Sequence, residues 1–142
     1  MAWELPVQAL SFEAAIDMSS SGNESTLHGQ YRVMRSSAAG FIRYQENSSG
    51  TIIGVLQNAP IAGESASVVT YGVSKIWVAT TAADIAVGET VTGTTNGGIM
   101  PVAAATNSLV GVALEPCTSG PLLISVLLSG PGSGGSTVSL FV

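Results

Sequence analysis

The sequence predicts an all-β domain, a small barrel or sandwich, with an extended arm before it and a short flexible tail after it. Between residues 30 and 128, about eight short apolar or alternating segments are separated by turns rich in Gly, Pro, Ser and Asn. One turn, Asn96-Gly97-Gly98, is a hairpin signal because Asn and Gly adopt positive φ at little cost. We therefore divide the chain into an arm (1–29), a barrel-like core domain (30–128) and a linker with an apolar tip (129–142).

The strands of the core domain are expected where apolar residues alternate or run together. They are residues 31–35, 41–44, 51–57, 68–80, 90–95, 99–103, 109–114 and 122–128. The segments 109–114 and 122–128 are nearly continuous in apolar residues, which predicts strands covered on both faces.

The segment 68–80 is the longest alternating run. Its Val69, Tyr71, Val73, Lys75 and Trp77 are expected on one face, because strand side chains alternate with period two. On that face the stem of Lys75 would cover the sheet while its ammonium reaches water or the Trp77 ring. A lysine that blocks unwanted pairing at a sheet edge is the alternative interpretation.

The arm carries more large apolar side chains than an isolated segment can shelter. These are Trp3, Leu5, Val7, Leu10, Phe12, Ile16 and Met18. A short helix around 11–17 and an extended arm both fit the pattern, although Ala14 stands where a capping box would place Glu or Gln. In either form the apolar side chains need a surface to cover them, so we expect the arm to bind a neighbouring molecule.

The end of the chain changes character again. Residues 129–136 form a Gly- and Ser-rich linker with a random-coil span of about 15 Å. Residues 137–142 are β-prone, and Leu140, Phe141 and Val142 are their candidate contact residues. This tip either docks on a neighbouring molecule or folds back on its own domain.

The charge pattern excludes several classes of partner. The chain has 4 basic and 9 acidic residues and a net charge of −5, too few cations for nucleic acid or an anionic membrane surface. Its longest apolar run, 122–128, is far shorter than the roughly 18 to 20 residues needed to span a bilayer. The first ten residues contain no basic side chain, so we expect no secretory signal and synthesis in the host cytoplasm.

Residues for chemistry are sparse, so we expect no enzyme and no catalytic, metal-binding or cofactor-binding residues. His28 is the single histidine, and Cys117, the single cysteine, is expected to be a small buried hydrophobe. Asp84 and Glu89 lie in a loop as solvated acids. Glu64 is expected to be a turn residue, because its surroundings lack the strand-to-helix turn of a nucleophile elbow.

Several fragments, in their order and spacing, carry a family resemblance over residues 10–128. They are Leu10-Ser-Phe-Glu-Ala-Ala-Ile-Asp-Met-Ser, Tyr31-Arg-Val-Met-Arg, Gly54-Val-Leu-Gln-Asn-Ala-Pro, Ala62-Gly-Glu-Ser-Ala-Ser-Val, Tyr71-Gly-Val-Ser-Lys, Val87-Gly-Glu-Thr-Val, Leu109-Val-Gly-Val-Ala-Leu-Glu and Ile124-Ser-Val-Leu-Leu. The chain resembles the small bacteriophage capsid cement, or head decoration, proteins. The long loop 19–29 and the linker with its tip depart from the family pattern, so their contacts are not carried over.

The resemblance implies a β-barrel-like or β-tulip domain that forms homotrimers. Such trimers sit on the outer surface of the expanded head, bridge major capsid protein subunits and stabilise the shell as structural virion components without catalysis. A receptor-binding or adhesin module of a phage tail or spike is the alternative function. The apolar arm and tethered tip favour the cement protein, whereas an adhesin would carry more exposed aromatic residues than the 6% aromatic content supplies.

Overall fold

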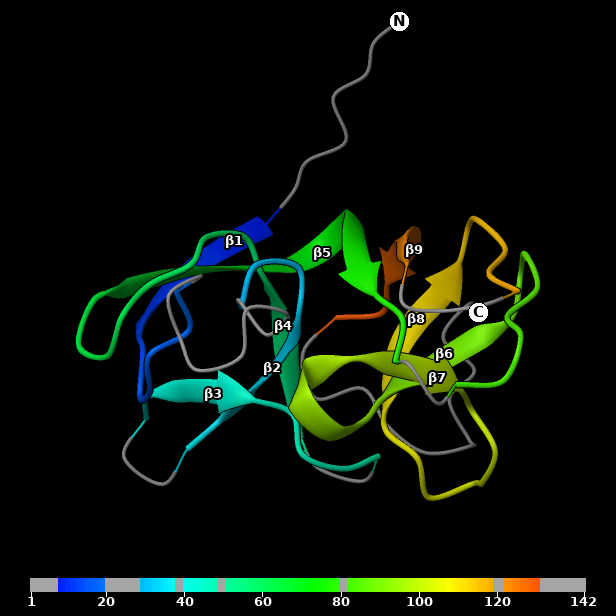
Figure 1. Cartoon of the computed structure of the whole chain (residues 1–142), viewed down its shortest axis with the longest axis horizontal. Coiled ribbons are helices and arrows are strands. Elements are labelled where there is room, and N and C mark those ends of the chain that lie inside the picture. The colour runs from blue at the N-terminus through cyan, green and yellow to red at the C-terminus, as the bar shows by residue number, and fades with distance from the viewer. Residues whose placement is uncertain are drawn as a thin grey trace, which may run out of the picture.

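The computed structural model describes residues 8–19, 29–37, 40–48, 51–79, 82–118 and 122–130, and in them the expected all-β, barrel-like class is confirmed (Figure 1). The elements are β1 (Gln8–Glu13), β2 (Val33–Ser36), β3 (Ile42–Tyr44), β4 (Ile52–Leu56), β5 (Ser65–Trp77), β6 (Thr90–Gly93), the 3-10 turn η1 (Thr95–Gly97), β7 (Ile99–Pro101), β8 (Leu109–Ala113) and β9 (Leu123–Leu128). No helix in these residues is long and apolar enough to cross a membrane.

The strands form one curled sheet in the order β3-β2-β4-β5-β9-β8-β6-β7, with β1 paired to β5. Its ladders are antiparallel, which suits a chain whose loops are short. The two ends of the sheet approach each other, because the Gly97 amide in η1 donates to the Gln45 carbonyl just after β3 at 3.0 Å. This contact joins the two ends of the curled sheet.

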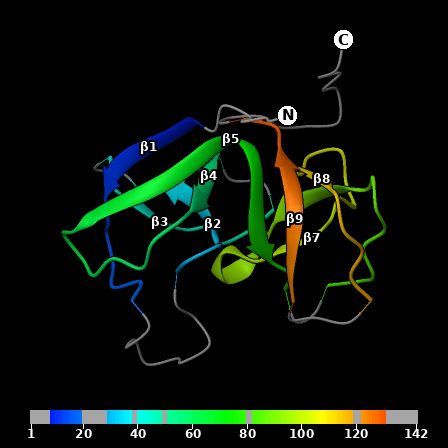
Figure 2. The same ribbon diagram turned by 90° about the horizontal axis from the view of Figure 1, so that it is seen from above.

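Strand β5 joins the two halves of the sheet (Figure 2). Its first half pairs with β1 on one edge and β4 on the other, since Val69 faces both Ala9 and Val55. From Gly72 onward it pairs with β9 instead. Gly72 has φ +98°, a conformation that side chains strongly disfavour, so this glycine permits the change of partner.

The apolar side chains inside the curl form two clusters. The larger one gathers residues of β4 to β9, among them Val55, Ile76 and Val126. The smaller one, which we call the second core, lies beneath β1 and contains Ala14, Met18, Met34, Ile42, Leu56, Ala66 and Val68. The segment after β1 is therefore part of the packed interior.

Each expected strand of the core domain has a counterpart, but the N-terminal expectation needs correction. Residues 8–13 are a strand of the sheet, so the helix around 11–17 is wrong, and an arm reaching to residue 29 is too long. The Gly29 amide donates to the Met18 carbonyl at 2.7 Å, which holds the ends of 19–29 together. The hairpin signal is confirmed, since Asn96 and Gly97 both have positive φ.

The expectation of cover on both faces is wrong for β9. Ile124, Val126 and Leu128 are buried, whereas Leu127 between them is 43% exposed. In β8 most residues are buried, but Leu114 just beyond it is also 43% exposed. The face of β9 that carries Leu127 therefore remains open in the described structure, whereas β8 is covered except at the half-buried Val112.

Candidate interaction surfaces

The residues considered for chemistry do not come together in a site. Within the described ranges no three His, Cys, Asp or Glu side chains could hold a metal ion, and His28 lies outside them. Cys117 is 3% exposed in the larger cluster and exchanges backbone hydrogen bonds with Ile85, as a structural cysteine should.

The loop acids serve as turn residues. Glu64 accepts a hydrogen bond from the Ile61 amide at 3.0 Å, which confirms its expected place in a turn. Glu89 accepts one from the Ala86 amide at 2.9 Å, while Asp84 is exposed. These carboxylates stabilise their own loops and do not converge on a cleft.

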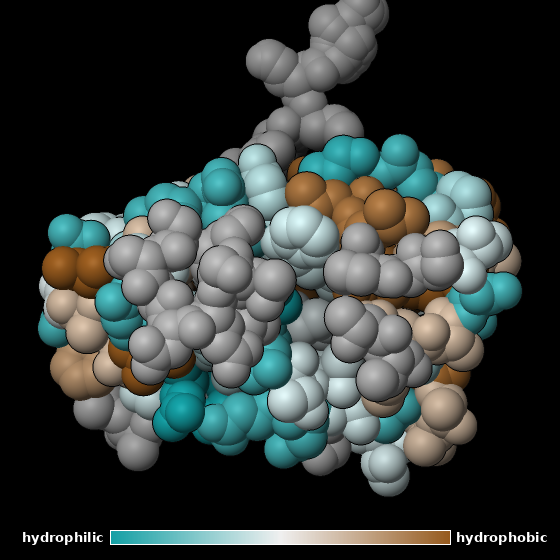
Figure 3. Space-filling view, viewed as in Figure 1, coloured by the Kyte–Doolittle hydropathy of each residue, from teal (hydrophilic) through white to brown (hydrophobic). Residues whose placement is uncertain are grey.

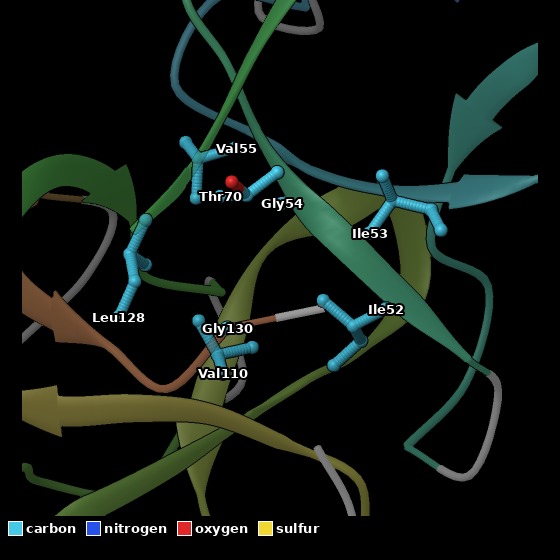
Figure 4. A pocket seen from close by; sticks show the side chains of 8 residues that line it. All are labelled: Ile52, Ile53, Gly54, Val55, Thr70, Val110, Leu128 and Gly130. Atoms are coloured by element: carbon cyan, nitrogen blue, oxygen red, sulfur yellow. The ribbon is translucent and has the colours of Figure 1, made fainter. Parts of the chain in front are cut away.

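Two hollows of the described structure differ in size and lining. A depression of about 10 Å³ lies where Ile52, Val110 and Leu128 face one another between β4, β8 and β9 (Figure 4). It has room for about one water molecule, and its lining is apolar. A larger hollow of about 520 Å³ is shallow and polar, beside Arg35 and Glu46.

The four cations are all engaged within the protein. Arg35 and Arg43 both bind Glu46, at 2.7 and 2.9 Å. Arg32 lies over the Trp77 ring at 5.8 Å and donates to the Asn96 carbonyl at 3.2 Å. Partial burial lowers the pKa of Arg32, an effect that the nearby Tyr44 opposes. This arrangement offers no open basic surface for a polyanion.

The ammonium of Lys75 is held by an acidic side chain, a partner that the sequence analysis did not name. Its Nζ binds Glu115 Oε2 at 2.6 Å, and the Ser125 amide donates to the same oxygen at 2.6 Å. The hydrogen bond from Lys75, followed by those from Ser125, lowers the pKa of Glu115 to about 2. Lys75 and Glu115 thus form a polar boundary on an otherwise apolar part of the sheet.

The predicted binding residues of the arm fall into three groups. Met18 is fully buried in the second core, and Phe12 and Ile16 are half-buried against it, so these three hold the fold together. Leu10 is 41% exposed on β1 and remains available to a partner. The others, namely Trp3, Leu5, Val7, Leu140, Phe141 and Val142, lie outside the described residues.

The sequence analysis missed an exposed apolar surface on β5, β9 and β8. We call it the outer face and define it as Tyr71, Val73, Val112, Leu114 and Leu127. Tyr71, Val73, Leu114 and Leu127 are between 38% and 49% exposed, and Val112 is half-buried. Figure 3 shows apolar surface gathered over β8 and β9. Two sequence patterns relate to it, namely the alternation that puts Tyr71 and Val73 on one face of 68–80 and the long apolar run 122–128, but neither reveals which side is covered.

The described chain begins and ends at one corner of the outer face. Gln8, at the start of β1, pairs with Tyr71. Leu128, at the end of β9, pairs with the next residue, Gly72. Gly130 lies so close to the Tyr71 ring that an added Cβ would be 2.8 Å from its hydroxyl oxygen. Residues 1–7 and 131–142 therefore both connect to the sheet beside Tyr71.

Comparison with known proteins identifies a matching family and a similar solved structure. The family model described as "Phage cement protein" matches residues 15–128. A solved structure, the head fiber gp8.5 N base of bacteriophage phi29, has a TM-score of 0.57 and 19% identity, covering 87% of this chain and 94% of that chain. At that identity the likeness concerns the fold. No curated protein sequence matches the chain.

Proposed function

Because the chain belongs to the phage cement protein family, we propose that it binds the outer surface of the expanded phage head as homotrimers and stabilises the shell by bridging major capsid protein subunits. The family match carries this proposal, since it spans every strand from β2 to β9. The similar solved structure is the base of a head fiber, which supports a place on the head rather than on the tail. The adhesin alternative has no comparable support.

The charge distribution suits a protein repeated many times on one shell. Three copies at −5 each give a trimer with a net charge of −15 and, at 14.3 kDa each, a mass of about 43 kDa. This charge is modest for that mass because each chain contains few ionised groups. At physiological salt the Debye length is about 8 Å, so repulsion between neighbouring copies is weak. The cations that could attract packaged DNA are already engaged by Glu46, Glu115 and Trp77. Nucleic acid and membranes are therefore not among the proposed partners.

The proposed contact with the head is made by the N-terminal segment 1–7 together with exposed Leu10. Because β1 holds residues 8–13 in the sheet, only Trp3, Leu5 and Val7 of the seven predicted arm side chains precede the sheet. Seven residues reach at most about 24 Å, enough to cross onto an adjoining capsid subunit. Their apolar side chains would supply the binding energy, and three copies in one trimer would bind with avidity.

This proposal is tested by sedimenting the protein with undecorated, expanded heads. The double variant Trp3→Ser/Leu5→Ser is expected to sediment with heads at least tenfold more weakly than the unmodified protein, because it loses apolar contact area and keeps the fold. Val87→Ser, which changes a 61% exposed side chain elsewhere, should bind as the unmodified protein does. Failure of the unmodified protein to bind heads would contradict the function, whereas normal binding by the double variant would contradict only the role of the N-terminal segment.

A further inference from the structure

We propose that the outer face binds the C-terminal segment 137–142 of its own chain. The outer face is the part of the described surface where exposed apolar side chains lie on three adjacent strands. The C-terminal segment is apolar and joins the sheet at the corner of that face. This inference does not depend on the head-binding function, because it concerns how the chain covers its own surface.

The outer face has the layout of a binding surface. Val73, Leu127 and Val112 are direct cross-strand partners, so their side chains lie in one row across β5, β9 and β8. Tyr71 marks one end of the face. The other end is closed by Lys75, whose ammonium is held by Glu115. An apolar row with a polar boundary is typical of a surface that another segment covers.

The chain leaves β9 in the right place to reach this face. Gly130 packs against the Tyr71 ring, and its φ of +97° turns the backbone after Ser129. Six residues, 131–136, then separate it from the segment, and a Gly- and Ser-rich linker of that length spans about 13 Å. Four residues along β5, from Tyr71 to Lys75, also cover about 13 Å. The linker therefore matches the length of the face.

The chemistry of the segment matches the surface. Residues 137–142 read Thr-Val-Ser-Leu-Phe-Val and contain no charged side chain. As a strand they would place Val138, Leu140 and Val142 on one side, since side chains alternate. That side would pack on the row of Val73, Leu127 and Val112, as two sheets pack face to face.

Effective concentration favours binding of the segment to the outer face of its own chain over binding to the outer face of a neighbouring chain. A Gly- and Ser-rich linker of six residues would hold its segment at millimolar concentration near Gly130, far above the concentration of other chains in dilute solution. The N-terminal segment is a less suitable occupant. It connects at the same corner beside Tyr71 but continues into β1, which pairs with the first half of β5, whereas residues 131–142 continue directly from β9, a strand of the outer face.

Disulfide trapping tests the proposal in the full-length chain. In a Cys117→Ala background, Val73→Cys is combined with Leu140→Cys, and formation of the intrachain disulfide is followed under mild oxidation. The matched control combines Ile61→Cys with Leu140→Cys, because Ile61 is 47% exposed but lies before β5, far from the outer face. We expect the Val73 pair to close at least tenfold faster than the Ile61 pair. Equal rates would overturn the proposal, since they would mean random collisions of the segment.

Two further disulfide experiments test for other occupants of the outer face. Chains carrying only Val73→Cys are also refolded with chains carrying only Leu140→Cys. An interchain disulfide that forms in this mixture as fast as the intrachain disulfide of the Val73→Cys/Leu140→Cys chain would overturn the choice of the same copy. A Val73→Cys/Leu5→Cys chain that closes faster than the Val73→Cys/Leu140→Cys chain would assign the face to the N-terminal segment and overturn the proposal.

A second measurement avoids cysteine chemistry. The variant Leu140→Asp/Phe141→Asp should bind the hydrophobic dye ANS several-fold more than the unmodified chain, because charged residues would leave the outer face uncovered. Adding Leu127→Asp to that variant should remove the gain, because Leu127 is a central residue of the exposed row. Unchanged ANS binding in the first variant would count against the proposal.

Discussion

Gln8 pairs with Tyr71 across the antiparallel ladder of β1 and β5. This pairing moves the boundary between sheet and arm from residue 30 to residue 8. It also brings the start of β1 beside the end of β9, since Leu128 pairs with the neighbouring Gly72. Both terminal segments are thus attached at one corner of the sheet, where they can serve different surfaces.

The new boundary predicts different results for two N-terminal deletions. Removing residues 1–7 should lower the melting temperature by no more than about 3 °C, because no described contact is lost, and should abolish binding to heads. Removing residues 1–29 should prevent folding, because it deletes β1, Ala14 and Met18. Circular dichroism melting curves of the two variants provide the measurement. A folded protein after the longer deletion would contradict the place of β1 in the sheet.

Met18 is predicted to stabilise the fold rather than to bind a partner. Met18→Ala should lower the free energy of unfolding by about 3 kcal/mol, since it leaves a cavity in the second core. Leu10→Ala, at a 41% exposed position nearby, should cost less than about 1 kcal/mol. Urea denaturation distinguishes the two variants. Equal costs would mean that the segment after β1 is not packed as described.

Gly111 is predicted to be essential for the contact between β8 and β9. A Cβ at this position would collide with the carbonyl oxygen of Leu127 on the adjacent strand. Gly111→Ala should therefore lower the free energy of unfolding by about 3 kcal/mol. Gly63→Ala is the matched control: Gly63 has φ +86° but open space around it, so the cost should be about 1 kcal/mol. The same denaturation experiment compares them, and a smaller loss for Gly111→Ala would be inconsistent with this packing.

The Lys75–Glu115 pair predicts a dependence of stability on acid pH. The pKa of Glu115 falls from an ordinary 4.5 to about 2 in the folded protein, so folding favours the ionised carboxylate. The resulting stabilisation is present above pH 4.5 and is lost as the pH falls towards 2. NMR titration of the Glu115 carboxyl should show this low midpoint, and Lys75→Met should raise it towards 4.5. A midpoint near 4.5 in the unmodified protein would show that the ion pair does not form.

The core strands could be predicted from sequence because their evidence is local. Alternation in 68–80 and the Asn96-Gly97 turn each act within a few residues, and the structure has a strand or a turn in those places. β1 could not be placed in the same way. Its partner lies more than fifty residues away on β5, and its pattern, Gln-Ala-Leu-Ser-Phe-Glu, fits an unpaired extended segment equally well.

The surfaces were harder to predict than the strands. A continuous apolar run such as 122–128 predicts a strand, but the curl of the sheet decides whether Leu127 faces the interior or the outside. In the same way, Met18 is buried where Gly29, eleven residues further along the chain, packs against it, a contact that the sequence does not specify. The exposure of the outer face was recognised only in the structure, although the alternation in 68–80 already put Tyr71 and Val73 on one side of the strand.

Counting copies of this chain in purified virions tests the proposed cement function most directly. Quantitative mass spectrometry of intact particles, scaled to the major capsid protein, would give the number per head. Our account predicts a large number of copies, a multiple of three that approaches the number of major capsid protein subunits. It also predicts that the chain disappears from a sample when the head fraction is removed. A count of only a few copies, or recovery with purified tails alone, would contradict it.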